Sequence, residues 1–263
     1  MSNLVLSEIR IHPVKSLGGF TVQETLLSDR GPLHDRRWML VDREGRFMTQ
    51  REIPGMACLH TEPLAKGFAV TDRRTGEALE LPWSLPDGEE RMCTVWSDRV
   101  RTRVGAPEWS AWFSARLDLD LTLVNMPDST RRHTDGRYAQ GLTSLSDGFP
   151  YLIISQASLD ELNTRLKDPV GMERFRPNLV IAGGTPFQED DWRSITIGGL
   201  RFDLVKPCAR CTIITTDQAT GARQQEPLRT LATYRTNANK VLFGMNTMGP
   251  ASGSIRVGDL VHP

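Results

Sequence analysis

Residues 192–217 read WRSITIGGLRFDLVKPCARCTIITTD and carry both a strand pattern and a cysteine pair. Apolar and β-branched residues predict strands on both sides of the CARC motif. The motif places Cys208 and Cys211 three positions apart, with Arg210 between them. The chain has only four cysteines, so the chemistry open to this pair limits the functions open to the protein.

Further strand patterns recur on both sides of this stretch, with turn signals such as DREG and LPDGEE between them. They favour a sheet curled into a barrel or sandwich. Helical periodicity is confined to two places, so the fold class that we predict is mixed and mostly β (α+β) with a few helices. The expected strands lie in 3–12, 36–42, 94–105, 178–183, 192–207, 211–217 and 253–263, and the helices in 106–119 and 155–168. In the second helix we expect Ser158 as the cap and Leu159, Leu162 and Leu166 on one face.

The polar, turn-rich stretch 125–148 is the best candidate for a boundary between two units. We therefore predict an N-terminal unit over 1–125 and a C-terminal unit over 126–263. A chain of 263 residues is long enough for each unit to bury a core of its own.

Charge and hydropathy exclude several classes of protein. Lys and Arg number 32, as do Asp and Glu, so no overall charge favours nucleic acid or an anionic membrane surface. No stretch approaches the roughly 20 apolar residues of a membrane helix. The N-terminus lacks the pattern of a secretion signal, and four cysteines do not make a disulfide scaffold, so we expect a cytoplasmic protein.

The cysteine pair allows several kinds of site. A structural zinc site requires a second pair of cysteines or a later pair of histidines. No histidine lies between Cys211 and His262. A thioredoxin-like dithiol should open a helix, whereas a strand is expected here. Two half-buried cysteines without chemistry remain the simplest alternative. Against it stands Arg210, whose guanidinium would stabilise a thiolate, a soft ligand suited to a transition metal.

Cations and hydrogen-bond donors also gather at predicted strand ends and loops, where ligand sites collect. Such a set suits an anionic, phosphate-bearing cofactor. Its members are Lys15 and Ser16 in IHPVKS, Arg36 and Arg37 in HDRRW, and Arg176 and Asn178 in FRPN.

These motifs together resemble the MOSC family, and more narrowly the branch of the mitochondrial amidoxime reducing components and their bacterial relatives. The resemblance runs collinearly through IHPVKS, DRRW, SDGFPYLIISQASL, FRPNLVI, KPCARC, TTDQATG, EPLRTL and IRVGDLV. It implies an N-terminal β-barrel unit packed on a C-terminal MOSC β-barrel domain that binds the molybdenum cofactor, a molybdopterin.

The resemblance also implies a role for each site residue. Cys211 would be the catalytic residue and the ligand to molybdenum, with Ala209 and Arg210 contacting the cofactor beside it. Position 209 is often Ser in relatives, so only the backbone can serve there, and Gly148-Phe149 replaces a Thr-Ser of some relatives. The implied cofactor-binding residues are Lys15, Ser16, Arg36, Asp147, Gly148, Phe149, Arg176, Asn178, Ala209, Arg210 and Cys211.

The function implied is reduction of amidoximes, hydroxylamines and N-hydroxylated bases by oxygen-atom abstraction at molybdenum. The sequence runs to VGDLVHP, and we expect no fused ferredoxin domain of the kind that some bacterial relatives carry. We therefore expect electrons from a separate protein, a ferredoxin, a flavin reductase or a cytochrome b5-like protein. Two alternatives stay open: a sulfur or cofactor carrier, as in molybdenum cofactor sulfurases, and a non-catalytic zinc module.

A proton donor is also needed. Asp217 in TTDQATG is the leading acid by proximity to Cys211, although a turn aspartate before Gly221 is at least as good an interpretation. His12 and His34 flank the cofactor motifs as further candidates. Trp38 and Trp192 are expected in the core.

Overall fold

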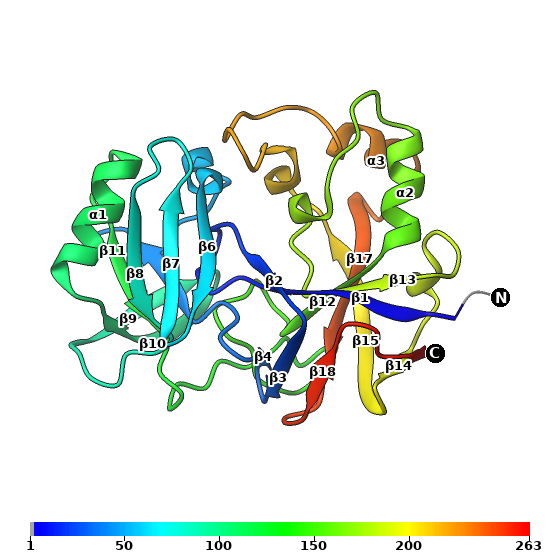
Figure 1. Cartoon of the computed structure of the whole chain (residues 1–263), viewed down its shortest axis with the longest axis horizontal. Coiled ribbons are helices and arrows are strands. Elements are labelled where there is room, and N and C mark those ends of the chain that lie inside the picture. Colours follow the sequence, from blue (N-terminus) through cyan, green and yellow to red (C-terminus); the bar gives the residue numbers. More distant parts are fainter. Residues whose placement is uncertain (1–2) are drawn as a thin grey trace.

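Strands from both ends of the chain build the larger sheet of this computed structural model, which describes residues 3–263 (Figure 1). The sheet has the order β19-β14-β15-β17-β12-β13-β1-β2, and β16 pairs with β17 beside it. Its strands are β1 (Val5–Ile11), β2 (Phe20–Val22), β12 (Tyr151–Ser155), β13 (Leu179–Ala182), β14 (Ser194–Ile197), β15 (Leu200–Ala209), β16 (Thr236–Asn237), β17 (Lys240–Met248) and β19 (Val261–His262).

Two further sheets come from the N-terminal half, and their labelled strands β6 to β11 lie to the left in Figure 1 together with helix α1 (Pro107–Leu117). One sheet has the order β5-β11-β10-β9 and another the order β6-β7-β8, while β18 and β4 flank β3 in a third. Their bounds are β3 (Glu24–Ser28), β4 (Gly31–Pro32), β5 (Trp38–Val41), β6 (Leu59–Leu64), β7 (Gly67–Asp72), β8 (Ala78–Pro82), β9 (Glu90–Val95), β10 (Asp98–Val104), β11 (Thr122–Asn125) and β18 (Ser254–Arg256).

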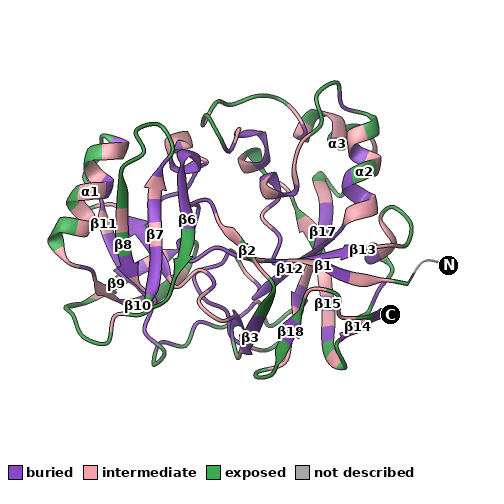
Figure 2. Cartoon of the chain, in the orientation of Figure 1, coloured by how far each residue is buried: buried purple, intermediate pink, exposed green. Residues whose placement is uncertain are grey.

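The large sheet buries both of its faces. In β12, Ile153 belongs to one hydrophobic cluster and Ile154 to another, because successive strand residues point to opposite faces. Helices α2 (Gln156–Thr164) and α3 (Leu228–Tyr234) cover the face of Ile154, and Figure 2 shows the buried strands beneath their exposed outer surfaces. Short 3-10 turns complete the fold: η1 (Pro54–Cys58), η2 (Met172–Arg174), η3 (Gln188–Asp190) and η4 (Thr212–Thr215).

The prediction of a mostly β fold with few helices is confirmed. Helix α1 falls within the predicted range 106–119, and Trp38 and Trp192 are buried as expected. Their exposed fractions are 0% and 6%.

The boundary between residues 125 and 126 stays a prediction. β1 pairs antiparallel with β13, and β13 pairs parallel with β12, so the start of the chain lies in the sheet of the C-terminal half. Conversely, β18 from the C-terminal end pairs with β3. The two halves therefore share strands, and each helps to hold the other.

The expected role of Ser158 as a helix cap is wrong. Helix α2 begins at Gln156, and the Ser158 hydroxyl donates instead to the carboxylate of Glu189, 2.8 Å from Oε1. The backbone N–H of Ser155 also donates to Glu189 Oε1, at 3.1 Å. A buried carboxylate 31 residues away thus takes the place of a local cap. Leu159 and Leu162 are buried on one face of this helix as predicted, whereas the helix ends at Thr164 and Leu166 joins the same cluster from beyond its end.

The strand expected over 211–217 is also wrong. The chain leaves β15 at Ala209 and forms the 3-10 turn η4. β-branched residues favour strands, but Ile214 turns into the cluster that includes Phe175 and Phe243, and this packing overrides the local preference.

Candidate functional site

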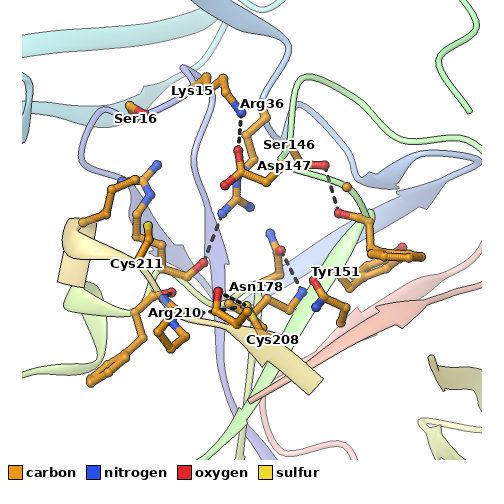
Figure 3. Close-up of a pocket in the computed structure, with 18 residues that line it drawn as sticks. Lys15, Ser16, Arg36, Ser146, Asp147, Tyr151, Asn178, Cys208, Arg210 and Cys211 are labelled. Atoms are coloured by element: carbon orange, nitrogen blue, oxygen red, sulfur yellow. Dashed lines mark hydrogen bonds and ion pairs between the residues drawn. The ribbon is translucent and has the colours of Figure 1, made fainter. Parts of the chain in front are cut away.

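A cavity of about 130 Å³ lies at the end of β15, where loops of both halves of the chain meet (Figure 3). All eleven residues that the family resemblance assigned to cofactor binding line it. They are Lys15, Ser16, Arg36, Asp147, Gly148, Phe149, Arg176, Asn178, Ala209, Arg210 and Cys211. The structure therefore brings together segments that lie up to about 200 residues apart, while their role in binding stays a prediction.

Irregular pairing of β15 with β17 positions the cysteine segment. The register shifts between Leu204 and Lys206 and again between Pro207 and Ala209. Such bulges bend a strand and redirect its side chains, often beside functional sites. Beyond them, Cys208 is half-buried and Cys211 is exposed, and neither forms a disulfide.

Arg210 fixes the segment between the two cysteines. Its backbone N–H donates to the carbonyl of Val241 at 2.7 Å, and its guanidinium donates to the carbonyl of Phe175 at 2.7 Å. A second guanidinium nitrogen lies 3.2 Å from Cys208 Sγ. The side chain therefore holds Cys208 and the backbone next to Cys211 against a neighbouring loop.

Two arginines form the opposite wall. Arg36 donates to the buried carboxylate of Asp35 at 2.5 Å and to the carbonyl of Arg176 at 3.0 Å. Arg176 in turn donates to the carbonyl of Leu17. Burial and the nearby Arg36 lower the pKa of Arg176 from its ordinary value. Arg36 is thus balanced by Asp35, whereas Arg176 is held by a backbone carbonyl and forms no ion pair among residues 3–263.

Three residues of the wall have left-handed backbones, with φ of 66° at Ser16, 48° at Arg36 and 56° at Arg176. This conformation is uncommon in residues other than glycine, and it persists where neighbouring structure enforces it. Strained residues of this kind gather at functional sites, and here all three line the cavity.

Lys15 is 4% exposed and donates to the carbonyl of Leu145 at 2.8 Å and to Asp147 at 2.6 Å. Burial lowers the pKa of Lys15 to about 8, although Asp147 opposes the shift. Desolvation opposes ionisation of Asp147, but Lys15 and Arg51 outweigh it and hold the pKa of this carboxyl below its ordinary value. Both groups are thus charged at neutral pH.

Asn178 connects strands beneath the cavity, whereas Gly148 and Phe149 line its surface. The Asn178 side chain accepts from the backbone of Leu152 at 3.2 Å and donates to the carbonyl of Arg10 at 3.3 Å. Open space lies beside Gly148, and Phe149 contributes an aromatic wall. Asn178 therefore joins three strands at the cavity floor.

A wider basin of about 740 Å³ adjoins the cavity, and Asp147, Cys208 and Cys211 line both. Its rim contains Trp96, which is half exposed and stacks on the guanidinium of Arg51 at 4.5 Å. Trp96 also donates to Asp147 at 3.4 Å.

Sequence reasoning missed Trp96, Arg51, Tyr151 and Asn246 at this site. Tyr151 lies inside the motif PYLI, so the family resemblance could have identified it. The alternating pattern around Trp96 predicted only a strand, whereas Trp96 occupies the turn between β9 and β10.

The three candidate proton donors do not line the cavity or the basin. Asp217 accepts from Arg174 at 2.8 Å and from the backbone of Thr220 at 2.9 Å, as a turn aspartate does. His12 is buried, and burial with the nearby Arg176 lowers its pKa. His34 stacks on Trp83 with the ring centroids 4.3 Å apart. The alternative interpretation of Asp217 as a turn residue is therefore the better one.

Comparisons with known proteins identify the family of the chain. The family model for the MOSC N-terminal beta barrel domain matches residues 3–120, and that for the MOSC domain matches residues 140–262. The chain belongs to the MOSC family. It is 33% identical to mitochondrial amidoxime reducing component 2 of Rattus norvegicus, over 98% of this chain and 82% of that protein.

Two further relatives cover nearly the whole chain. The mitochondrial amidoxime-reducing component 1 of Mus musculus is 30% identical over 98% of this chain and 81% of that protein. The molybdenum cofactor sulfurase of Solanum lycopersicum is 32% identical over 98% of this chain but only 35% of that protein. The chain thus spans about a third of the sulfurase that it matches.

The MOSC family associates this chain with the molybdenum cofactor, and the residues present fit that group. The cavity lining includes four cations, Lys15, Arg36, Arg176 and Arg210, but one acid, Asp147. Asp147 pairs with Lys15, and Asp35 behind the lining pairs with Arg36, but Arg176 and Arg210 form no ion pair among residues 3–263. Because buried charges are unfavourable without a counter-charge, these two arginines suit a phosphate. The accessible thiol of Cys211 suits a soft metal.

Among residues 3–263, no group of three or more His, Cys, Asp or Glu side chains is arranged to hold a metal ion. Within the same range, no helix is long and apolar enough to cross a membrane.

Proposed function

We propose that this protein is a molybdenum-cofactor-dependent reductase of N-hydroxylated compounds such as amidoximes, hydroxylamines and N-hydroxylated bases. The observation that carries the proposal is the position of Cys211, an exposed thiol where a cationic cavity opens into a wide basin. The amidoxime reducing components, which match over nearly the whole chain, support the same reaction class.

The cofactor would be held from two sides. Lys15, Arg36 and Arg176 would bind its phosphate, and Cys211 would ligate the metal, as the cavity lining permits. When bound, the cofactor supplies the two-electron abstraction of an oxygen atom from the substrate. Each turnover takes two electrons and two protons and releases water with the reduced product.

The protein's own groups would orient the reactants and limit solvent. Arg210 holds the backbone beside Cys211, and Phe149 and Phe175 contribute apolar surface to the cavity. The carboxyl of Asp147, with its lowered pKa, keeps Lys15 protonated rather than serving as an acid. The electrons would come from a separate electron-transfer protein, and we place the reaction in the cytoplasm.

The first experiment is elemental analysis for molybdenum and zinc, on protein from a cofactor-replete host, for wild type, Cys211→Ser and Cys208→Ser. We expect molybdenum near one per chain in wild type, near zero in Cys211→Ser, and retained in Cys208→Ser. Wild type reduced with dithionite and methyl viologen should convert benzamidoxime to benzamidine. Zinc without molybdenum in every sample would contradict the proposal and would favour a structural zinc site at the CARC motif.

A second candidate is a sulfur or cofactor carrier, favoured by the match of 98% of the chain to part of a molybdenum cofactor sulfurase. A carrier predicts persulfide on Cys208 or Cys211, detected by mass spectrometry, together with no reduction of benzamidoxime by the molybdenum-loaded protein. Turnover distinguishes the two candidates.

A further inference from the structure

A groove of about 590 Å³ lies against the segment that ends in Cys211. Ala209 and Arg210 line both this groove and the cofactor cavity, so only this segment separates the two. The groove shares a single lining residue, Ala209, with the wider basin, through which we expect substrate to reach Cys211. A protein seated in the groove would therefore lie next to the metal ligand and leave the basin open.

The groove is basic. Its lining includes Arg210, Arg229 and Lys240 but no acidic residue. Arg229 is 67% exposed and pairs with Glu226 at 2.7 Å, while Lys240 is exposed. Arg210 and Lys240 form no ion pair among residues 3–263. The lining of the groove therefore keeps a net positive charge.

The floor of the groove is apolar and firmly held. Leu228, Ala232 and Val241 line it. Helix α3 beneath it is anchored by Leu231, which is 0% exposed, and η4 by Ile214, which is 1% exposed. A small apolar floor with a charged rim is suited to transient contacts, whose partners are selected and steered by charge.

We propose that this groove is the docking surface for the electron donor, and that the donor is a small acidic electron-transfer protein. The inference rests on the proposed function, which requires an external donor. Charge complementarity selects an acidic partner, and the shared residues Ala209 and Arg210 give the electrons a short route to Cys211.

The test compares two charge-reversed double variants of the molybdenum-loaded protein. Arg229→Glu/Lys240→Glu alters the groove. The control, Lys66→Glu/Arg201→Glu, changes the net charge equally at two exposed residues that do not line it. Arg201 matches Arg229 closely, since it is 69% exposed and pairs with Asp203 at 2.8 Å. Benzamidoxime reduction is measured with two donors, reduced methyl viologen and an acidic [2Fe-2S] ferredoxin with its NADPH-dependent reductase.

Methyl viologen is a small cation and needs no acidic docking, so all three proteins should agree within about two-fold with it. With ferredoxin at low ionic strength, the groove variant should show a KM for ferredoxin raised about ten-fold, and the control should resemble wild type. The difference should shrink toward nothing in roughly 0.5 M salt, where exposed charges are screened.

The outcomes separate the two proposals. Absence of turnover in wild type with viologen would overturn the proposed function and the docking surface with it. Turnover with viologen, but an unchanged KM for ferredoxin in the groove variant, would overturn the docking surface alone. So would wild-type protein that turns over with viologen but takes electrons from none of ferredoxin, flavodoxin and cytochrome b5.

Discussion

The two halves of the chain use cysteine in opposite ways. Cys58 and Cys93 in the N-terminal half are 1% and 0% exposed, and burial raises the pKa of both thiols. Cys208 and Cys211 in the C-terminal half lie open to a cavity and a basin. The first pair fills space as small apolar side chains do, whereas the second is placed where a ligand can reach it. Burial, rather than residue type, separates packing from chemistry here.

The largest expected difference between the pairs is in alkylation. In native, metal-free protein, iodoacetamide should modify Cys208 and Cys211 at least about a thousand-fold faster than Cys58 and Cys93, because buried thiols react only from opened states that native proteins rarely populate. Peptide mass spectrometry at successive times measures the rates, with guanidinium-unfolded protein as the control in which all four react. Comparable alkylation rates in the native protein would contradict the distinction between a buried and an accessible cysteine pair.

Cys93→Ser should be the next largest effect, and it falls on stability. Serine replaces the weakly polar sulfur by a hydroxyl that is costlier to bury and has one nearby partner, since Cys93 Sγ lies 3.2 Å from Thr102 Oγ1. We expect the exchange to lower the free energy of unfolding by about 1–3 kcal/mol. Urea unfolding measures this change, and molybdenum per folded chain should stay at the wild-type value. Cys208→Ser is the matched control and should unfold close to wild type. Loss of molybdenum from folded Cys93→Ser would mean that the N-terminal pair also serves the site.

Charge at the cavity gives a third contrast, between buried Lys15 and exposed Lys66. Lys15→Gln in metal-free protein should weaken binding of inorganic phosphate about ten-fold at pH 7, because a charged hydrogen-bond donor is lost. Lys66→Gln should have no effect.

The pH dependence follows from the pKa of Lys15, which burial lowers to about 8. Below that pH the ammonium is present, and above it the ammonium is lost, so wild-type affinity should fall toward that of Lys15→Gln as the pH rises from 7 to 9. Isothermal titration calorimetry across this range measures it. Parallel pH profiles in the two proteins would show that Lys15 does not face the anion.

The same distinction between local and distant contacts explains what sequence could predict. Alternation found β1, β5, β10 and the run from β13 to β15, but it missed the whole β6-β7-β8 sheet and the long strand β17. The motifs of the family resemblance did better, since all eleven residues assigned from them line the cavity. The pattern could not show that β1 joins β13, since that pairing spans about 170 residues. Nor could it show that the Ser158 hydroxyl donates to Glu189, or that Ile214 packs into a cluster with Phe175 and Phe243 instead of continuing a strand. In each case a contact between segments far apart in the sequence decides the structure, and for Ile214 it overrides the local preference for a strand.

The smallest expected effect concerns an acid near the cysteines that does not face the site. Asp217→Asn keeps the side chain's shape and its acceptor oxygen for the turn that ends at Gly221, but it removes the charge opposite the buried guanidinium of Arg174, 2.8 Å away. We expect turnover of benzamidoxime within about two-fold of wild type across the pH profile, because a proton donor would cost roughly a hundred-fold or more.

Stability should respond instead. Desolvation opposes ionisation of Asp217, but hydrogen bonds from Thr220 and Ala219 outweigh it and hold its pKa below the ordinary value. A carboxyl with a lowered folded-state pKa adds stability above its unfolded pKa, roughly 4, and loses it as the pH falls through the folded value. Asp217→Asn should therefore unfold more easily than wild type at pH 7, and the two proteins should converge toward pH 3. A large loss of turnover with unchanged urea unfolding would instead return Asp217 to the chemistry, and would show that proximity in sequence had been the better guide.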